Sequence, residues 1–317
     1  MVRADAPGKI ILFGEHAVVY GQPAIAAPLH AVQASATVEP APYGSGLSVY
    51  APDIGQTLRL ESLDGGPDDP LHNAFIFPLQ VALRYLQHPI PDLSITIHST
   101  IPIASGLGSG AALATALVRA LCSALGHPLS NDELNPLIFQ VEQRHHGTPS
   151  GIDNTVIVYE QPVYFIRGAP PQPFAIARPF TLLVADTGHS SPTRKTVDDV
   201  RRLYETAPEQ IGAIFSAIGG IARQAREKIA AGEIAPLGLL MDRNHDLLCQ
   251  LTVSSEALDR LCAAARTAGA LGAKLSGGGR GGNIVALVDD VRAASVAEAL
   301  RSAGAVNVIQ TVVKPSG

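Results

Sequence analysis

Residues 102–117, "PIASGLGSGAALATAL", place three glycines and two serines directly before a run of small apolar residues. The preceding stretch, 93–101, alternates apolar and polar residues and predicts a strand, and the following stretch predicts a helix from 110 to 125. A helix N-terminus that follows glycine-rich backbone presents unpaired N–H groups, which suit an anion such as a phosphate. Ser105 and Ser109 add hydroxyl groups for phosphate or Mg²⁺. The alternative reading is a tight strand-to-helix turn that binds no ligand.

The composition is that of a globular chain large enough for one large or two medium domains. The 317 residues are 46% hydrophobic and 16% charged, with only 5% aromatics, so we expect a core of Ala, Leu, Ile and Val. The net charge of −5 gives no basic face for nucleic acid. Cys122, Cys249 and Cys262 form no CxxC cluster, which predicts buried, reduced thiols in a cytoplasmic protein. The sequence has neither a long apolar run for a membrane span nor a signal-peptide core.

Strands and helices are predicted along the whole chain, with a domain boundary in a proline-rich stretch. We expect strands at 8–13, 24–38, 155–159, 162–166 and 181–186, an irregular excursion at 42–70, and a helix at 71–87. A second helix should end at 146. Ser130 and Glu133 have capping-box spacing, but Pro136 favours Asn135 as the N-cap. Several helices to about 268 and a closing β-β-α-β order predict an α+β protein with domains at 1–175 and 176–317.

A second glycine-rich loop, "SGGGRGG", occupies residues 276–282. It contains GxGxxG at Gly277, Gly279 and Gly282, but a strand-like segment follows where a dinucleotide-binding fold needs a helix. The P-loop motif is absent, because the only Gly-Lys pair, Gly8-Lys9, is followed by isoleucine. The loop therefore either approaches a ligand or the first glycine loop, or is a simple glycine hairpin.

Two acidic residues are spaced for phosphoryl transfer. Glu142 lies late in a polar helix and Asp153 follows the turn "GTPSG". One hard oxygen ligand for Mg²⁺ and one carboxylate base are a minimal set for transfer to an alcohol. The alternative is a solvated helix acid and an ordinary turn aspartate. The neighbouring His145 and His146 point about 100° apart on a helix, so they do not predict a shared metal ion.

Four stretches together resemble the ordered motifs of the GHMP small-molecule kinases. They are "APGKIILFGEHAVVYGQPAIA" (6–26), "PIASGLGSGAALA" (102–114), "EQRHHGTPSGIDN" (142–154) and "KLSGGGRGG" (274–282). Within that family the first and third stretches, and the helical region 243–261, are most similar to the mevalonate kinase branch. The resemblance implies an α+β GHMP kinase fold, with an N-terminal domain like ribosomal protein S5 domain 2 and a ferredoxin-like C-terminal domain.

The resemblance also implies roles for individual residues. Asp153 would be the base and Lys9 would stabilise the acceptor oxygen, while Glu15, His16 and, more weakly, Thr193 would bind mevalonate. Ser109 and Glu142 would hold Mg²⁺. The residues expected to bind the co-substrate ATP are Pro102, Ser105, Gly106, Leu107, Gly108, Ser109, Gly110, Gly278 and Arg280.

Two departures from the family pattern bear on these roles. Gly110 stands where the family usually has a second serine, which leaves open which hydroxyl reaches Mg²⁺. Arg280 stands where the family usually has glycine, so its side chain either meets the triphosphate or points to solvent.

The function that the resemblance implies is ATP-dependent phosphorylation of the mevalonate 5-hydroxyl, a step of isoprenoid biosynthesis. The alternatives are a kinase for another small alcohol, such as phosphomevalonate or a sugar, and a catalytically silent ligand-binding protein of the same fold. Neither nucleic acid nor membrane is expected as a partner. Homodimers are common in the family, and the sequence leaves that state open.

Overall fold

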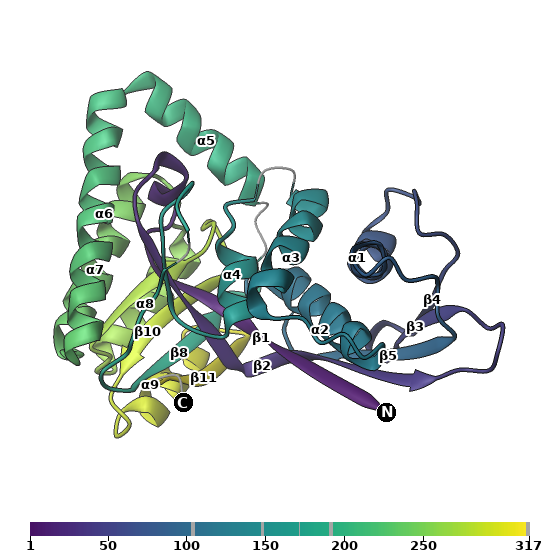
Figure 1. The fold of residues 1–317 in the computed structure, drawn as a ribbon. Helices are drawn as coiled ribbons and strands as arrows, with labels where there is room; N and C mark the ends of the chain where they lie inside the picture. Colours follow the sequence, from purple (N-terminus) through teal and green to yellow (C-terminus); the bar gives the residue numbers. More distant parts are fainter. Residues whose placement is uncertain (103–104, 147–148, 171, 190–192, 315–317) are drawn as a thin grey trace. The chain divides into compact units, whose positions relative to one another are not determined.

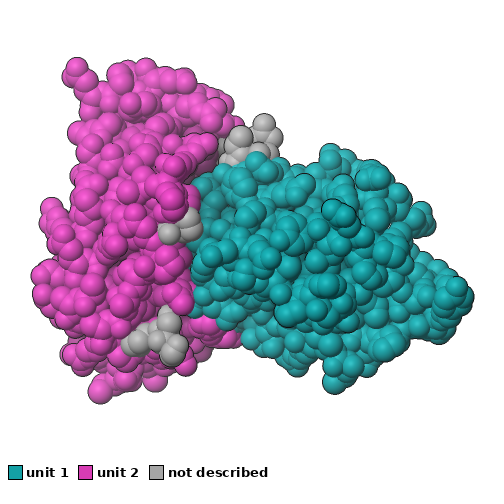
Figure 2. Space-filling view, in the orientation of Figure 1, with its two compact units in different colours: residues 1–8, 32–103, 107–160 teal, residues 9–31, 104–106, 161–317 magenta. Residues whose placement is uncertain are grey.

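The computed structural model describes the chain except for residues 103–104, 147–148, 171, 190–192 and 315–317, and it describes only the backbone of 145–146 and 193–194. The chain forms two compact units (Figure 2). Unit 1 comprises residues 1–8, 32–103 and 107–160, and unit 2 comprises 9–31, 104–106 and 161–317. The domain boundary at 175/176 stays a prediction. No helix in the described ranges is both long enough and apolar enough to cross a membrane.

Strands β1 (Val2–Phe13) and β2 (Ala24–Pro40) contribute to both units, because each is divided between them. The second half of β2 pairs antiparallel with β5 (Leu93–Ser99), and β5 pairs parallel with β3 (Leu47–Ala51). β3 pairs antiparallel with β4 (Gln56–Leu60). Ala36, Ile97 and Ile95 are buried, as expected of a sheet with one face on the core.

The helices of unit 1 pack against its strands and against one another (Figure 1). A π-helical turn, η3 (His72–Ile76), leads into α1 (Phe77–Tyr85), and α2 (Ser109–Ala124), α3 (Asn131–His146) and α4 (Ile152–Tyr159) follow. α2, α3 and α4 pack against one another. Ala112, Ala114 and Ala116 of α2 are fully buried, so the small residues allow close packing.

Three predictions in unit 1 are wrong. Residues 47–60 form β3, the short helix η2 (Pro52–Ile54) and β4, because the buried alternation of Leu47, Val49 and Ala51 makes a strand despite the glycines and prolines around it. Residues 155–159 lie in helix α4, where packing on α2 and α3 outweighs the β propensity of the branched side chains.

The third error concerns the start of α3. The helix begins at Asn131, and the capping box is formed: Glu133 N donates to Ser130 Oγ at 3.3 Å, and Ser130 N donates to the Glu133 carboxylate at 2.9 Å. These bonds stabilise the first turn, and the packing of α3 on α1, α2 and α4 offsets the cost of Pro136 inside the helix. Asn135 is therefore a helical residue, not the N-cap.

Unit 2 contains a four-stranded antiparallel sheet in the order β11-β8-β10-β9. The strands are β8 (Phe180–Asp186), β9 (Gly272–Ser276), β10 (Asn283–Val288) and β11 (Asn307–Val313). In chain order this is strand, helices, two strands, helix and strand, with the first and third strands at the centre, which is the ferredoxin-like arrangement. Two short strands, β6 (Val163–Phe165) and β7 (Gln172–Pro173), pair with each other, and β6 pairs with the start of β2.

The helices of unit 2 share one apolar cluster with one face of its sheet, and the sequence predicts helices on one face. They are α5 (Thr193–Thr206), α6 (Pro208–Ala231), α7 (Ala235–Gln250), α8 (Glu256–Thr267) and α9 (Ala293–Ser302). Alternate strand residues such as Ala273, Leu275 and Ile284 pack into one apolar cluster with these helices. Most of the core is Ala, Leu, Ile and Val, which confirms the expectation from composition. Cys122 and Cys262 are buried free thiols, whereas Cys249 is exposed and corrects the prediction for that residue.

Candidate active site

The segment after β1 makes an unusual turn at His16. The N–H of Ala17 donates to the carbonyl oxygen of Glu15 at 2.6 Å, and His16 has φ +59° and ψ −48°. This is the geometry of a γ-turn of the rare, strained kind. Backbone strain of this kind costs about 1–3 kcal/mol and persists only where the surrounding structure holds it. Two adjacent polar side chains, Glu15 and His16, are placed by this turn.

His16 is a buried neutral imidazole with one acceptor nitrogen unused. Its Nε2 lies 3.0 Å from the carbonyl oxygen of Gly278, and because a carbonyl only accepts, Nε2 carries the proton. Nδ1 is therefore an acceptor, and it has no hydrogen-bond partner among the described residues. Burial lowers the pKa of His16 to about 4, with a smaller contribution from the charge of Arg280. The ring stays neutral at pH 7.

Glu15 is also buried and also has one atom unused. Its Oε1 accepts from the ammonium group of Lys274, while Oε2 is buried without a hydrogen-bond partner among the described residues. Burial raises the pKa of Glu15, and the charges of Lys274 and Lys9 oppose this. The sequence analysis missed Lys274. The signal was available, since a lysine at the centre of the apolar strand "GAKLS" is a charge at a buried position.

Aromatic packing fixes the chain directly after these two residues. The short helix η1 (Ala17–Tyr20) places Tyr20 on the ring of Phe215 in α6, with centroids 4.2 Å apart and nearly parallel planes. Tyr204 of α5 packs beside both rings. Ala17 is fully buried in the apolar cluster of unit 2. The turn at His16 is thus held from its C-terminal side by the helices of its own unit.

The second glycine-rich loop is a hairpin connection that also contacts the first loop. Residues 277–282 join β9 to β10, and Asn283 Nδ2 donates to the carbonyl oxygen of Ser105. A Cβ on Gly279 would lie 2.0 Å from the carbonyl oxygen of Val253, so a side chain has no room there. The loop is therefore a hairpin and also approaches the first loop, so both of these alternatives are correct. Asn283 is a second residue that the sequence analysis missed.

Arg280 has left-handed backbone and a defined ion pair. Its φ is +58°, which explains why glycine suits this position better. The guanidinium group pairs with the carboxylate of Asp199 in α5, and Nε donates to the carbonyl oxygen of Thr252 at 3.2 Å. The Arg280 side chain is 30% exposed, so it is partly buried and does not simply point to solvent.

In unit 1, Glu142 faces the N-terminal turn of α2. Its side chain is buried on α3, and a Cβ on Gly110 would lie 3.6 Å from Oε1. Ser109 is the first residue of α2, after Gly108 in left-handed conformation. A buried carboxylate beside a helix N-terminus and a hydroxyl is a set of hard oxygen donors that fits Mg²⁺.

Asp153 lies in the first turn of α4. The positive end of the helix dipole favours a carboxylate there. Asn135 of α3 accepts from Asn154 Nδ2 at 2.7 Å and holds the start of α4 against α3. Asn135 therefore positions the backbone next to Asp153.

The predicted site residues fall in both units. Unit 2 contains Lys9, Glu15, His16, Ser105, Gly106, Gly278, Arg280 and Thr193, and unit 1 contains Pro102, Leu107, Gly108, Ser109, Gly110, Glu142 and Asp153. Lys9 is buried on β1. Thr193 is the first residue of α5, and its side chain lies outside the described atoms.

Two family models match this chain. The model for the GHMP kinases N terminal domain matches residues 77–161, and the model for the GHMP kinases C terminal region matches residues 225–306. The mevalonate kinase of Pyrococcus horikoshii is 36% identical over 327 residues, which cover 98% of this chain and 95% of that protein. The mevalonate kinase of Aeropyrum pernix is 35% identical over 301 residues, covering 90% of this chain and 88% of that protein.

Solved structures agree with these matches. The crystal structure of L. major mevalonate kinase in complex with R-mevalonate has a TM-score of 0.86 and 31% identity, and the comparison covers 100% of this chain and 97% of that chain. The chain belongs to the GHMP kinase family, a family of ATP-dependent kinases. It is a small-molecule kinase, and its α+β fold is the GHMP kinase fold, as the sequence predicts.

Proposed function

We propose that this protein is an ATP-dependent mevalonate kinase, which transfers the γ-phosphoryl group of ATP to the 5-hydroxyl of (R)-mevalonate. The observation that carries the proposal is the full-length similarity to mevalonate kinases, at 36% identity over 98% of this chain for the Pyrococcus horikoshii protein. The likeness to the L. major enzyme bound to R-mevalonate supports it. The products would be 5-phosphomevalonate and ADP.

The acceptor would bind at Glu15 and His16, with Thr193 as a further contact. Glu15 Oε2 and His16 Nδ1 are buried acceptors without partners among the described residues. A buried acceptor that lacks a donor costs about 1–3 kcal/mol, and a ligand hydroxyl would remove that cost. Of the two hydroxyl groups of mevalonate, the 3-hydroxyl would donate to one of these two atoms, because the proton of the 5-hydroxyl is assigned to the base.

ATP would bind at the first glycine-rich loop and at Gly278 and Arg280 of the second. Backbone N–H groups at the start of α2 support this role, because Gly108 lets the loop turn directly into the helix. Glu142 and Ser109 would hold Mg²⁺, which when bound neutralises charge on the phosphate oxygens. Gly110 offers no hydroxyl, so Ser109 is the hydroxyl that we assign to the ion.

The reaction itself would use Asp153 and Lys9. Asp153 would accept the proton of the 5-hydroxyl as its oxygen attacks the γ-phosphorus. Lys9 would lower the proton affinity of that hydroxyl and stabilise the charge that develops on the oxygen. We also propose a cytoplasmic location with small molecules as the partners, and we keep the 1–175 and 176–317 domains as part of the proposal.

An ADP-release assay with a panel of alcohols tests the proposal. The purified chain with ATP and Mg²⁺ is given (R)-mevalonate, 5-phosphomevalonate, galactose or homoserine in turn. We expect ADP release with mevalonate and a kcat/KM at least about a hundredfold lower with the others. Release with phosphomevalonate or galactose alone would show a kinase for another alcohol. No release with any acceptor, from protein that binds ATP, would favour a silent ligand-binding protein.

A further inference from the structure

Lys274 is a buried cation at the centre of an edge strand. It pairs in register with Val285 of β10, while its neighbours Ala273 and Leu275 face the apolar cluster under the helices. Because side chains alternate along a strand, Lys274 projects from the opposite face of the sheet. Its side chain is 0% exposed. Burying an ammonium group costs several kcal/mol unless it is paired and hydrogen-bonded, so such a residue needs a specific partner.

The contacts of Lys274 give the two carboxylate oxygens of Glu15 different environments. Nζ donates to Glu15 Oε1 and, at 2.6 Å, to the carbonyl oxygen of Leu275. Glu15 Oε2 receives no hydrogen bond from the described residues and is shielded from solvent. The ion pair therefore fixes the rotation of the carboxylate and leaves one defined oxygen to accept a hydrogen bond.

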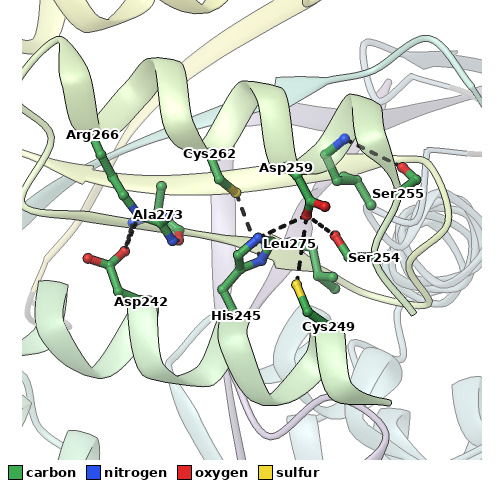
Figure 3. Close-up of polar contacts among 11 residues, drawn as sticks. Asp242, His245, Cys249, Ser254, Ser255, Asp259, Cys262, Arg266, Ala273 and Leu275 are labelled. Atoms are coloured by element: carbon green, nitrogen blue, oxygen red, sulfur yellow. Dashed lines mark hydrogen bonds and ion pairs between the residues drawn. The ribbon is translucent and has the colours of Figure 1, made fainter. Parts of the chain in front are cut away.

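Side chains of α7 and α8 hold the free edge of β9 on both sides of Lys274 (Figure 3). Asp242 accepts from the N–H of Ala273 at 2.9 Å, and Arg266 donates to the carbonyl oxygen of Ala273 at 2.6 Å. The N–H of Leu275 donates to His245 Nδ1 at 3.3 Å. These bonds replace the strand partner that an edge strand lacks, so the direction of the Lys274 side chain is fixed by its backbone.

The hydrogen bonds of His245 suit a role in supporting β9 better than a role as a metal ligand. Its Nε2 and the side chains of Cys249 and Asp259 bring possible ligand atoms within 4.8 Å of one another (Figure 3). However, Nδ1 accepts from a backbone N–H, so in the neutral ring Nε2 carries the proton and donates to Asp259 at 3.2 Å. A metal on Nε2 would need the proton on Nδ1, where it would face the N–H of Leu275. The cluster is therefore a hydrogen-bonded support for β9.

We propose that Lys274 is a positioning residue for the acceptor alcohol, acting through Glu15. The proposal rests on the proposed function, because it takes the acceptor site to be at Glu15. Lys274 does not touch the acceptor. It orients the Glu15 carboxylate so that Oε2 accepts a hydrogen bond from a hydroxyl of the substrate alcohol. Its removal should therefore weaken acceptor binding and leave ATP binding unchanged.

A comparison of K274M, E15Q and the double variant E15Q/K274M tests this role. Methionine keeps the length and volume of the lysine stem without its charge. We expect K274M and E15Q each to raise the acceptor KM at least about tenfold, with the ATP KM within twofold of wild type. The double variant should have the same acceptor KM as E15Q alone, because the lysine acts only through the glutamate. K228M is the matched control, since Lys228 pairs with Glu233 at the surface.

Several results would overturn the proposal. One is a folded K274M whose acceptor KM stays within twofold of wild type. Another is a K274M whose ATP KM rises as much as its acceptor KM. A third is a double variant whose acceptor KM shows the product of the two single effects. Should K274M fail to fold, E15Q/K274M removes both buried charges and avoids an unpaired one. Its acceptor KM must then equal that of E15Q, and a higher value contradicts the proposal. The alcohol used in these assays is the one that the wild-type protein phosphorylates in the ADP-release assay. A wild type that does not phosphorylate mevalonate would contradict the proposed function, whereas the variants test only the role of Lys274.

Discussion

His16 Nε2 donates a hydrogen bond to the carbonyl oxygen of Gly278, 262 residues further along the chain, at 3.0 Å. The bond joins the first family motif to the second glycine-rich loop inside unit 2. It fixes the tautomer of His16 and leaves Nδ1 as a hydrogen-bond acceptor. Glu15, the preceding residue, also has a buried oxygen, Oε2, without a partner among the described residues. One hydrogen bond thereby links a residue proposed to bind the alcohol to the loop proposed to bind ATP.

Two substitutions of His16 should distinguish the effect of its side chain on alcohol binding from the effect of its strained backbone on stability. His16→Ala should raise the acceptor KM by roughly tenfold or more, through loss of a hydrogen bond, with little change in the ATP KM. His16→Gly should have the same kinetic effect but be more stable than His16→Ala by about 1 kcal/mol, since glycine adopts φ +59° without strain. Steady-state kinetics and urea unfolding measure the two effects. A higher ATP KM with unchanged acceptor KM would move His16 out of the acceptor site.

The same residue predicts how stability depends on pH. The pKa of His16 is about 4 in the folded chain, against 6.5 for a solvated histidine such as that of the unfolded chain, so the unfolded chain binds more protons between these values. The stability that comes from this group is complete above pH 6.5 and is lost as pH falls toward 4. The shift corresponds to a loss of about 3 kcal/mol. Urea unfolding of wild type and His16→Asn from about pH 4 to 8 should show a smaller pH dependence in the variant. Equal slopes would contradict a buried neutral His16.

Asp153→Asn tests the proposed base. The variant should bind ATP as wild type does and lose about 10²- to 10⁴-fold in turnover, the usual cost of removing a general base. Asp64→Asn is the control, because the Asp64 side chain is 91% exposed. Isothermal titration with a non-hydrolysable ATP analogue and an ADP-release assay give the two readouts. A wild-type rate in Asp153→Asn would leave activation of the hydroxyl to Lys9 and Mg²⁺.

Arg280 offers a test of the proposed ATP contact. Arg280→Gly should weaken ATP binding by about 1–3 kcal/mol if the guanidinium group meets phosphate, and the loss should shrink at high salt. Asp199→Asn removes the ion-pair partner and should strengthen ATP binding, since the cation is then no longer neutralised. An ATP KM within twofold of wild type in both variants, at any ionic strength, would show that Arg280 serves only to hold α5.

Local sequence patterns predicted the elements that long-range packing does not override. The strand at 93–99, the helix from 109 to 124 and the closing β-β-α-β order are confirmed. Residues 155–159 form part of a helix and not the predicted strand, because their β-branched side chains are buried by two neighbouring helices that a local pattern cannot reveal. The spacing of Ser130 and Glu133 indicates the capping box that forms, whereas Pro136 wrongly favours a later start of the helix.

The site was predictable in its residue types but not in its partners. Glu15 and His16 were found by their motif, yet their buried bonds to Lys274 and Gly278 join positions more than 250 residues apart. The γ-turn at His16 has no sequence signal, since histidine is not a residue that favours positive φ as strongly as glycine. The ion pair of Arg280 with Asp199 likewise depends on how α5 packs in unit 2.

The most direct test of the central claim is the identity of the product. The chain is incubated with ATP, Mg²⁺ and (R)-mevalonate, and the product is examined by ³¹P–¹H correlated NMR. We predict a phosphate monoester whose phosphorus couples to the two C5 methylene protons, formed together with one equivalent of ADP. A phosphorus signal without that coupling, or unchanged mevalonate alongside phosphorylation of phosphomevalonate or a sugar offered in parallel, would contradict the assignment as a mevalonate 5-kinase.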